Sequence, residues 1–503
     1  MDKQNTDYEN TIISDNLQTN IDFIKNIFKK DSMLRVRQVR MNTGLGTGVD
    51  CCLFYFDGMV DSQLLNDSIV FPLQHSKIVI PPASLIDYIE KKVLFAGEVK
   101  QTSSMTDILR GIEYGDTALF VDGYSTVLII DTKGFDTRGI SEPEDERILQ
   151  GPREGFKEAI LYNTALLRRK LQTPDLCIEA QRIGRRTDTK LFICYLESLV
   201  DLNMLAELKA RLSKIDIDGV LDVNYLSELI RDHPCSPFKT TGVTERPDIV
   251  AARLLEGRIA VMVDGTPAVL TIPYLFVENF QSDEDYYLNY LVSSIGRILR
   301  FLCFFLAISI PALYLSLVGF HEELLPTMFA LSVAQARGGV PLSSLLECVA
   351  VIVIFEILKE TGVRMPQSLG HALAIVGGLI IGQAAVDARL VSAPVLIAVA
   401  LSGVCGLMVP RLRGIVFYAR FVLLFLGYLG GLFGFMLGIS ALFIMIFSLK
   451  SFGVDCTISL LGPSPQGLKD LLWRSSWRKM RTRPAFSRDR IRAGENKQQG
   501  SQQ

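Results

Sequence analysis

ILRFLCFFLAISIPALYLSLV, residues Ile298–Val318, is the stretch that decides the fold of this chain. Arg300 is its only charged residue, and a helix needs about 20 consecutive apolar residues to cross the hydrocarbon core of a bilayer. The stretch therefore predicts a transmembrane helix. Apolar runs broken only by single charges, glycines and prolines continue from it as far as Leu449, so we expect an integral membrane protein.

The apolar runs that follow predict a polytopic helical membrane domain over residues 291–450. Leu324–Ala336 is too short to span a bilayer, and Leu369–Val386 is softer and rich in glycine. Either four strong runs cross the membrane and these two segments are short or re-entrant, or all six cross. The strong runs after the first are Leu342–Leu358, Val391–Val409 and Phe421–Leu449.

The distribution of charge indicates which side each end occupies. The first ten residues (MDKQNTDYEN) contain no apolar run, so no cleavable signal peptide is expected and the N-terminal part should stay in the cytoplasm. Arg297 and Arg300 at the start of the first span fit the cytoplasmic side. From Lys469 onward ten Lys and Arg outnumber three acidic residues, which predicts that residues 451–503 form a basic cytoplasmic tail.

The same charge rule does not choose between four and six spans. In the four-span arrangement Arg411, Arg413 and Arg420 fall near the outer side of the membrane, against the rule. In the six-span arrangement Lys359 and Arg364 move to the outer side instead. Both alternatives leave the tail inside.

The part of the chain before the membrane domain contains an internal duplication. Gly115–Gly123 (GDTALFVDG) resembles Gly257–Gly265 (GRIAVMVDG), an offset of 257 − 115 = 142 residues. Phe54–Asp61 (FYFDGMVD) resembles Cys194–Asp201 (CYLESLVD) at a similar offset. We therefore expect two related α/β lobes, over residues 1–150 and 151–290, ahead of the helical domain.

Each lobe is predicted to end in a β-hairpin. Asp-Gly between two apolar runs is the strongest short hairpin signal, and it occurs at Asp122-Gly123 and at Asp264-Gly265. We interpret these aspartates as turn formers and not as catalytic acids. The predicted order in each lobe is a strand, a helix, a second helix and then the hairpin. The acidic run Ser282–Tyr287 (SDEDYY) marks the boundary before the membrane domain.

A basic segment lies between the two lobes. Gly151–Leu171 predicts a helix whose last turn carries Arg168, Arg169 and Lys170, where the helix dipole favours cations. Such a cluster can bind nucleic acid or anionic lipid, but a solvated surface paired with neighbouring acids is the commoner outcome. Pairing is therefore the favoured interpretation, and no nucleic-acid partner is expected.

Motifs for enzyme chemistry are lacking in the sequence. The chain has nine cysteines and four histidines, and none of them shows metal-ligand spacing. The glycines of Thr43–Gly48 (TGLGTG) precede a predicted strand, whereas a nucleotide-binding loop should open a helix, so they predict a turn. We expect no enzymatic activity, no catalytic residue and no cofactor or metal.

Two glutamates in one apolar run are the most informative polar groups. Glu347 and Glu356 are nine residues apart and therefore face opposite sides of an ideal helix. Ionisable groups within a membrane usually face a bundle interior or an aqueous path. Glu347 is the first candidate to line an ion path, and pairing with a neighbouring helix is the alternative. Glu356 with Lys359 is more simply an interfacial pair.

Further polar and small residues of the membrane domain are candidates for the path or for packing. Gln383, Asp387 and Arg389 end the glycine-rich segment, and Asp387 and Arg389 are predicted to pair at an interface. Overlapping G-x-x-x-G spacings favour close helix packing, in a bundle or an oligomer. The glycines concerned are Gly427, Gly431, Gly434 and Gly438.

Four strings of this sequence resemble one known family. They are RPDIVAARLLEGRIAVMVDGTPAVLTIPYLFVENFQSDEDYY (Arg246–Tyr287), FEILKETGVRMPQSLGHALAIVGGLIIGQAAV (Phe355–Val386), NTALLRRKL (Asn163–Leu171) and RSSWRKMRTRP (Arg474–Pro484). Together they are similar to the A subunits of GerA-type spore germinant receptors. The resemblance extends over nearly the whole chain.

The resemblance implies a receptor in the inner membrane of bacterial endospores, with both termini cytoplasmic. It implies B and C partner subunits, contact with membrane lipid, and a homo-oligomer, a pentamer, that forms a nutrient-gated channel for monovalent cations. The family's pore helix corresponds best to Leu342–Leu358. Two alternatives remain: an accessory scaffold of the same family without conductance, and a secondary transporter. Transporters often carry repeats in their membrane part, whereas here the repeat lies in the soluble part.

Overall fold

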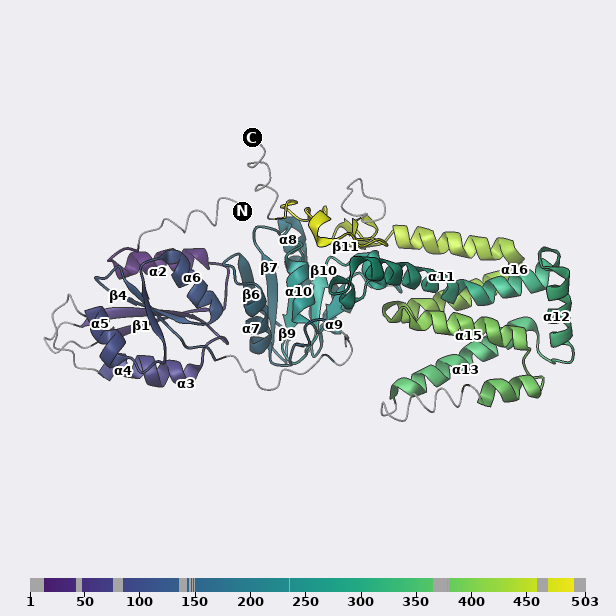
Figure 1. Ribbon diagram of the computed structural model, residues 1–503, viewed down its shortest axis with the longest axis horizontal. Coiled ribbons are helices and arrows are strands. Elements are labelled where there is room, and N and C mark those ends of the chain that lie inside the picture. The colour runs from purple at the N-terminus through teal and green to yellow at the C-terminus, as the bar shows by residue number, and fades with distance from the viewer. Residues whose placement is uncertain are drawn as a thin grey trace, which may run out of the picture.

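The computed structural model describes residues 13–41, 48–75, 85–134, 143, 146, 148, 150–234, 236–364, 378, 380–458 and 469–492. The molecule is elongated, with two α/β lobes followed by a region of long helices (Figure 1). We call residues 13–134 lobe 1, residues 150–289 lobe 2 and residues 290–447 the helical region. The predicted fold class, two related α/β lobes ahead of a helical region, is confirmed.

Lobe 1 is a five-stranded antiparallel sheet in the order β1-β2-β4-β5-β3. One face packs on α2 and α6, and the other on the helical turns between Ser62 and Val93. The strands are β1 (Leu34–Met41), β2 (Val49–Phe56), β3 (Val99–Thr102), β4 (Thr117–Val121) and β5 (Val127–Ile130). The helices are α2 (Leu17–Ile27), α3 (Ser62–Leu64), η1 (Leu65–Val70), α4 (Phe71–His75), α5 (Leu85–Tyr88), η3 (Ile89–Val93) and α6 (Met105–Tyr114).

Lobe 2 repeats this topology, with the sheet order β6-β7-β9-β10-β8. Its strands are β6 (Leu176–Ile183), β7 (Thr189–Leu196), β8 (Gly242–Thr244), β9 (Ile259–Val263) and β10 (Val269–Ile272). Its helices are α7 (Ile160–Lys170), α8 (Leu202–Ser213), α9 (Val223–Ile230) and α10 (Pro247–Leu254). The duplication read from the sequence is therefore present in the fold. Each lobe also has a first hairpin and a short edge strand that the predicted order lacked, and it begins with a helix, which in lobe 2 is the one predicted within Gly151–Leu171.

The two Asp-Gly turns have a second role. Gly123 and Gly265 both have positive φ, 83° and 94°, as such a turn requires. The carboxylate of Asp122 accepts a hydrogen bond from the backbone N–H of Leu17, the first residue of α2, at 3.1 Å. Asp264 accepts one from Ile160, the first residue of α7, also at 3.1 Å. Each turn thus caps the first helix of its lobe and satisfies an N–H that the helix itself leaves free.

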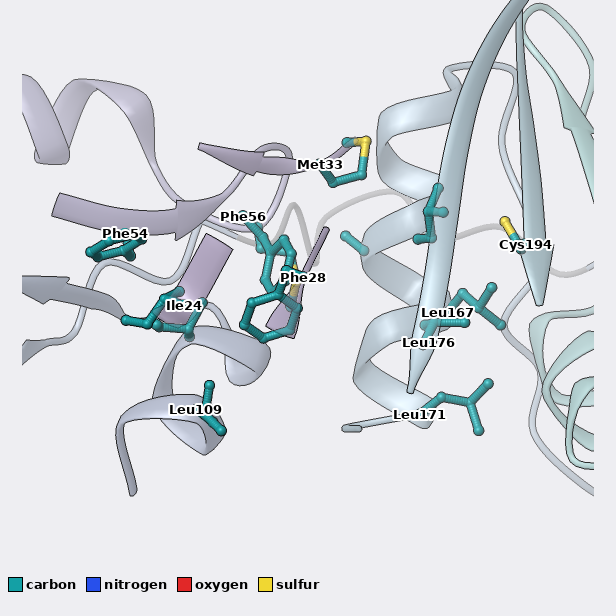
Figure 2. Packing of buried hydrophobic residues seen from close by; sticks show 14 of the residues in the cluster. Ile24, Phe28, Met33, Phe54, Phe56, Leu109, Leu167, Leu171, Leu176 and Cys194 are labelled. Atoms are coloured by element: carbon teal, nitrogen blue, oxygen red, sulfur yellow. The ribbon is translucent and has the colours of Figure 1, made fainter. Parts of the chain in front are cut away.

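The two lobes share one hydrophobic core. Phe28, Met33 and Phe56 of lobe 1 lie toward Leu167 and Leu176 of lobe 2, in a single cluster of buried side chains (Figure 2). Because apolar burial contributes about 25 cal/mol per Å², this continuous core holds the lobes together as one unit.

A buried ion pair crosses the same boundary. Arg168, at the end of α7, is 2% exposed and pairs with Asp31 of lobe 1. Its guanidinium lies 3.7 Å from the ring centroid of Phe56. Arg169 and Lys170 pair with Glu154. The basic helix end is therefore paired with acids inside the chain, as expected, but the expected solvated surface is wrong for Arg168, which is buried between the lobes.

The helical region runs away from lobe 2 and returns to it (Figure 1). Its helices are α11 (Tyr290–Phe320), α12 (Thr327–Arg337), α13 (Ser344–Arg364), residues 380–387, α15 (Ala393–Leu407) and α16 (Arg413–Phe447). Among the residues that the structure describes, two helical segments are long and apolar enough to cross a membrane, Tyr290–Phe320 and Pro410–Phe447. The short α12 lies across the end far from the lobes (Figure 1). Residues 369–377 and 379 of the predicted glycine-rich segment lie outside the described residues, as do residues 43–47 of the glycine loop.

Helix α16 reverses direction at Gly431, whose backbone is non-helical (φ 57°, ψ −139°). A Cβ at Gly434 would lie 2.1 Å from the carbonyl oxygen of Leu426, and one at Gly438 would lie 2.6 Å from Leu423. Residues 413–430 and 432–447 are thus two legs packed against each other. The run Phe421–Leu449, expected as one span, forms parts of both legs, because uniform apolarity does not reveal a turn made by one glycine.

The reversal brings both ends of α16 to the end of the helical region that faces lobe 2, which we call the near end. Arg411 contacts lobe 2 there, and Arg413 pairs with Glu360 of α13 at 2.8 Å. The cations at the start of α11 lie at the same end, so the conflict of charges in the predicted arrangements does not arise. The four-span alternative had placed Arg411 outside because it treated Phe421–Leu449 as a single pass. The six-span alternative had moved Lys359 outside because it let Leu324–Ala336 cross, whereas α12 lies across the far end (Figure 1).

Candidate functional site: the junction of lobe 2 with the helical region

The junction is built from segments that are far apart in the sequence. It contains the helical turns η4 (Phe276–Phe280), η5 (Asp283–Tyr286) and η7 (Pro410–Leu412), the start of α11, and residues 469–480 of the tail. Ser282 and Asp285 cap η5 reciprocally, and the side chain of Asn289 accepts the N–H of Leu291 at the start of α11. These short polar residues end lobe 2 and begin the long helix within a few positions.

Asp285 is the centre of the junction. Its side chain is 2% exposed and accepts hydrogen bonds from Arg297 Nε at 2.8 Å and Arg300 Nη2 at 2.6 Å. Arg297 also binds Asp470 of the tail through Nη1, at 2.7 Å. A buried charge costs several kcal/mol unless it is paired and hydrogen-bonded. The pairing therefore holds lobe 2, the first apolar helix and the tail in one arrangement.

The tail is bound to the junction through Arg474. This buried arginine donates to the backbone oxygens of Asp285 at 2.6 Å and Leu288 at 2.9 Å. Its backbone N–H donates to Ser294 Oγ of α11 at 3.0 Å. Tyr286 donates to Asp470 at 2.7 Å, and burial together with that carboxylate raises the pKa of Tyr286 well above its ordinary value. The phenol therefore stays protonated and donating.

A second charged cluster lies beneath the first. Glu278 accepts from Arg258 Nη1 at 2.5 Å and from the backbone N–H of Leu275 at 2.7 Å, and it pairs with Arg253 at 3.2 Å. Burial raises the pKa of Glu278, but the guanidinium groups of Arg258 and Arg253 outweigh burial and lower it overall. Glu278 is thus held ionised.

Arg411 connects the helical region to lobe 2 and to the segment between the lobes. It donates to the backbone oxygen of Glu278 at 3.1 Å, pairs with Asp283 at 2.9 Å and reaches Glu146 at 3.5 Å. Burial and the neighbouring Asp283 raise the pKa of Glu146. A cavity of about 710 Å³ opens beside these groups, lined by residues of lobe 2, α11 and η7.

A buried polar cluster lies inside the helical region, away from the junction. Arg420 of α16 is 1% exposed and donates to the backbone oxygens of Ala307 at 3.1 Å and Ser402 at 3.3 Å. Its Nη1 lies 3.6 Å from Glu356 Oε1, and Glu356 also pairs with Lys359 at 3.3 Å. Four helices, α11, α13, α15 and α16, thus meet at one guanidinium. The pair of Glu356 with Lys359 was expected from the sequence, whereas no partner was predicted for Arg420.

Glu347 lies on the opposite side of α13 and is fully buried. Its Oε2 accepts from the backbone N–H of Ser392 at 3.1 Å and from Ser392 Oγ at 2.7 Å. Ser392 is the residue that precedes the first turn of α15, so the carboxylate lies where a helix N-terminus favours negative charge. Glu347 Oε1 has no hydrogen-bond partner among the described residues. The contact with Ser392 at the start of α15 is of the kind expected in the alternative in which Glu347 pairs with a neighbouring helix. A role for Glu347 in an ion path stays a prediction.

The other predicted residues are spread over the far end and α16. Gln383, Asp387 and Arg389 are exposed. The ion pair predicted between Asp387 and Arg389 is absent from this part of the structure; Arg389 lies beside Gly339 instead, because its φ of 54° turns it away from the preceding helix. The glycines lie at close approaches: Gly427 against α11, Gly431 against the end of α11, and Gly434 and Gly438 between the two legs of α16.

The chain matches the family described as Bacillus/Clostridium GerA spore germination protein, over residues 22–486. The chain belongs to the GerA family. It is 37% identical over 489 residues to spore germination protein KA of Bacillus subtilis (strain 168), covering 96% of this chain and 89% of that protein. It is 32% identical over 451 residues to spore germination protein GerLA of Bacillus cereus, covering 89% of each.

Among solved structures, this GerA-family chain is similar to the N-terminal domain of the A subunit of the Bacillus megaterium spore germinant receptor GerK3. The identity is 31% and the TM-score is 0.42, and the likeness covers 53% of this chain and 98% of that one. The chain is also 36% identical to the membrane protein YfkQ of Bacillus subtilis (strain 168), over 96% of this chain and 93% of that protein.

Two of the four strings that carry the resemblance to the GerA family contribute residues to the junction. Arg246–Tyr287 supplies Arg253, Arg258 and Glu278, and the tail string supplies Arg474. The strings could be recognised from the sequence, but their spatial proximity could not be predicted. Contacts between residues nearly 200 positions apart leave no local pattern in a sequence. Within the described residues of this GerA-family chain, no group of three potential metal ligands gathers.

Proposed function

We propose that this chain is the A subunit of a spore germinant receptor, set in a membrane by its helical region. The lobes and the tail lie on one side, the cytoplasmic side, and B and C subunits complete the receptor. Family membership and the relatives named as spore germination proteins support this assignment. The placement of cations at the near end supports the orientation, because Lys and Arg favour the cytoplasmic side of a membrane protein.

The observation that carries the proposal is the junction around Asp285. The buried ion pair of Asp285 with Arg297 ties lobe 2 to α11, and Arg297 also binds Asp470 of the tail. The partly buried pair of Asp283 with Arg411 ties lobe 2 to η7, just before α16. Removing one partner of a fully buried pair typically costs about 3–5 kcal/mol. A displacement of the lobes is therefore passed to the first and last helices of the membrane domain, as a receptor that signals to a membrane path requires.

The membrane domain forms the cation path in an assembly of several copies, a pentamer by family resemblance. Glu347 is fully enclosed within one chain, so a path lined by it opens only when α13 moves relative to the N-terminus of α15. A nutrient bound elsewhere in the receptor would shift this equilibrium by its different affinity for the closed and open states. Release of Glu347 from Ser392 is the local event of opening in this proposal.

Cation release from spores that lack this subunit, exposed to a panel of nutrients, tests the assignment. The proposal predicts that at least one nutrient no longer triggers release and that the intact gene restores it. Normal release for every nutrient would contradict the proposal and favour an accessory scaffold of the same family. Retention of the chain in membranes after an alkaline wash checks the membrane setting independently.

A further inference from the structure

The two legs of α16 form an apolar groove that none of the interactions above uses. Its walls come from Ile415–Leu426 on the first leg and Gly438–Met445 on the second. Gly438 narrows the space between the legs because its missing Cβ leaves Leu423 and Leu426 close to the backbone. The groove encloses about 650 Å³. We call it the α16 groove.

A loop of lobe 2 closes the near end of the α16 groove. Pro234, Ser236 and Pro237 line it there together with Arg231. The loop is held against the helical region by Phe238, which is 1% exposed and lies in one buried cluster with Phe304 of α11 and Val416 of α16. The only polar side chains at this end of the groove, among the described residues that line it, are Arg231, Ser236 and Tyr418.

Arg231 is left without a countercharge. It donates through Nη2 to the backbone oxygen of Pro234, and its Nε is buried with no hydrogen-bond partner in the described structure. In the same part of the chain, no carboxylate lies within ion-pair distance of it, and the adjacent Asp232 pairs with Arg211. A guanidinium charge without a neighbouring carboxylate attracts a phosphate, because the two carry opposite charges and the guanidinium donates charge-assisted hydrogen bonds.

The dimensions of the α16 groove match one leaflet of a bilayer. Ile415 and Leu426 are eleven residues apart, which is about 16 Å along a helix. Half of the hydrocarbon core of a bilayer is about 15 Å. The α16 groove is therefore long enough for an acyl chain of one leaflet whose headgroup would lie at the near end, beside Arg231. A narrow, flexible chain with an anionic head fits both the apolar walls of the α16 groove and the cation at its near end.

We propose that the α16 groove binds one anionic phospholipid, with an acyl chain between the two legs and the phosphate on Arg231. The inference rests on the proposed function, because it requires α16 to lie in a bilayer. The bound lipid links lobe 2 to both legs of α16, at a point that the junction around Asp285 does not reach. The lipid composition of the membrane then affects how lobe 2 is held on the helical region.

Photocrosslinking of the full chain tests the site. The chain is reconstituted in phosphatidylcholine vesicles that contain phosphatidylglycerol, with a photoreactive acyl chain on one lipid or the other at equal mole fraction. Labelled peptides are mapped by mass spectrometry. We expect labels on both legs within 415–426 and 438–445, and about fivefold more from phosphatidylglycerol, since one cation near an anionic lipid contributes that much.

Four variants separate the headgroup from the groove. Arg231→Gln should abolish the fivefold preference, and Arg231→Lys should keep most of it. Ala441→Trp, at an exposed position in the groove, should reduce labelling by both lipids severalfold. Ile444→Trp is the matched control, because Ile444 is on the same leg, 70% exposed and outside the groove; its labelling should equal that of the unmodified chain.

Each other outcome overturns the inference. Equal labelling by the two lipids in the unmodified chain removes the assignment of the phosphate to Arg231. Crosslinks between two copies of the chain in place of lipid labels would assign the groove to a protein partner. Loss of the chain from alkaline-washed membranes would contradict the proposed function itself, whereas retention without lipid labels in the groove contradicts only this inference.

Discussion

Arg297 of the first apolar helix and Asp285 of lobe 2 are both almost fully buried, with 2.8 Å between Nε and the carboxylate. The pair lies where the chain passes from the α/β lobes to the helical region. Arg474 of the tail binds the backbone oxygen of the same aspartate. Lobe 2, α11 and the tail are thus joined at one residue, so a displacement of one of them is transmitted to the other two.

Asp285→Asn should destabilise the full-length protein by about 3–5 kcal/mol, because it leaves the buried guanidinium of Arg297 with reduced charge compensation. Thermal unfolding of the purified chain in detergent measures the effect. Asp455→Asn is the matched control: its ion pair with Lys450 is more than half exposed, so a change within about 0.5 kcal/mol is expected. Equal stability of the two variants would contradict the central place of Asp285.

Arg168→Met should weaken the attachment of the lobes, since Asp31 is then buried without its partner. The double variant Arg168→Met with Asp31→Leu should recover most of the lost stability, because replacing both members of a buried pair by apolar groups is often neutral. Hydrogen exchange of β1 and β6 in the full chain reports the boundary from both sides. If the single and double variants were equally destabilised, packing on Phe56 and not charge would be the main contribution.

Arg420→Glu should disrupt the helical region severely, because it places a second carboxylate opposite Glu356 inside the bundle. Exchange of the two charges, Arg420→Glu with Glu356→Arg, should restore part of the stability. The helical content that survives heating in detergent measures both. A charge exchange no better than the single substitution would show that the bonds of Arg420 to Ala307 and Ser402 matter more than its attraction to Glu356.

Glu113 of α6 gives lobe 1 a dependence on pH. Burial raises its pKa to about 8, and its Oε1 has no partner among the described residues. In the unfolded chain its pKa is about 4.3. The folded state therefore binds a proton at Glu113 more tightly than the unfolded state does. The contribution of Glu113 to the free energy of unfolding is fully present below about pH 4.3 and is lost as the pH rises toward and through 8.

Glu113→Gln should remove this pH dependence, since glutamine does not titrate. Unfolding of the full chain by denaturant at a series of pH values between 5 and 9 measures it. The variant should gain stability relative to the unmodified chain as the pH rises toward 8, and the gain should shrink toward pH 5, because the unfolded chain binds the proton only near about pH 4.3. Parallel curves for the two proteins would mean that Glu113 is solvated in lobe 1.

The sequence predicted what local patterns specify. Asp122-Gly123 and Asp264-Gly265 each carry a complete turn signal, so the two related lobes could be recognised before their shape was known. Gly431 could not be singled out, because it stands among other glycines in a uniformly apolar run and only its positive φ marks the reversal. Because of this reversal, Arg411 and Arg413 lie at the near end and not on the opposite side, where the four-span arrangement had placed them.

The candidate site was hidden for a different reason. Asp285, Arg297 and Arg474 each have an ordinary local explanation: an acidic boundary, a cation at the start of a span and a basic tail. Their function as a unit depends on three-dimensional contacts across up to 189 positions of the chain. Glu347 illustrates the converse, since its position in an apolar run was evident but its partner Ser392, 45 positions away, was not.

The most direct test of the central claim is nutrient-triggered cation release from spores that carry Asp285→Asn in place of the intact subunit, with Asp455→Asn as the control, both at normal protein levels. If the junction passes a signal from the lobes to the membrane helices, Asp285→Asn should change the rate of release at least about tenfold, equivalent to about 1.4 kcal/mol, and the control should not. Unchanged release from Asp285→Asn spores would contradict the account.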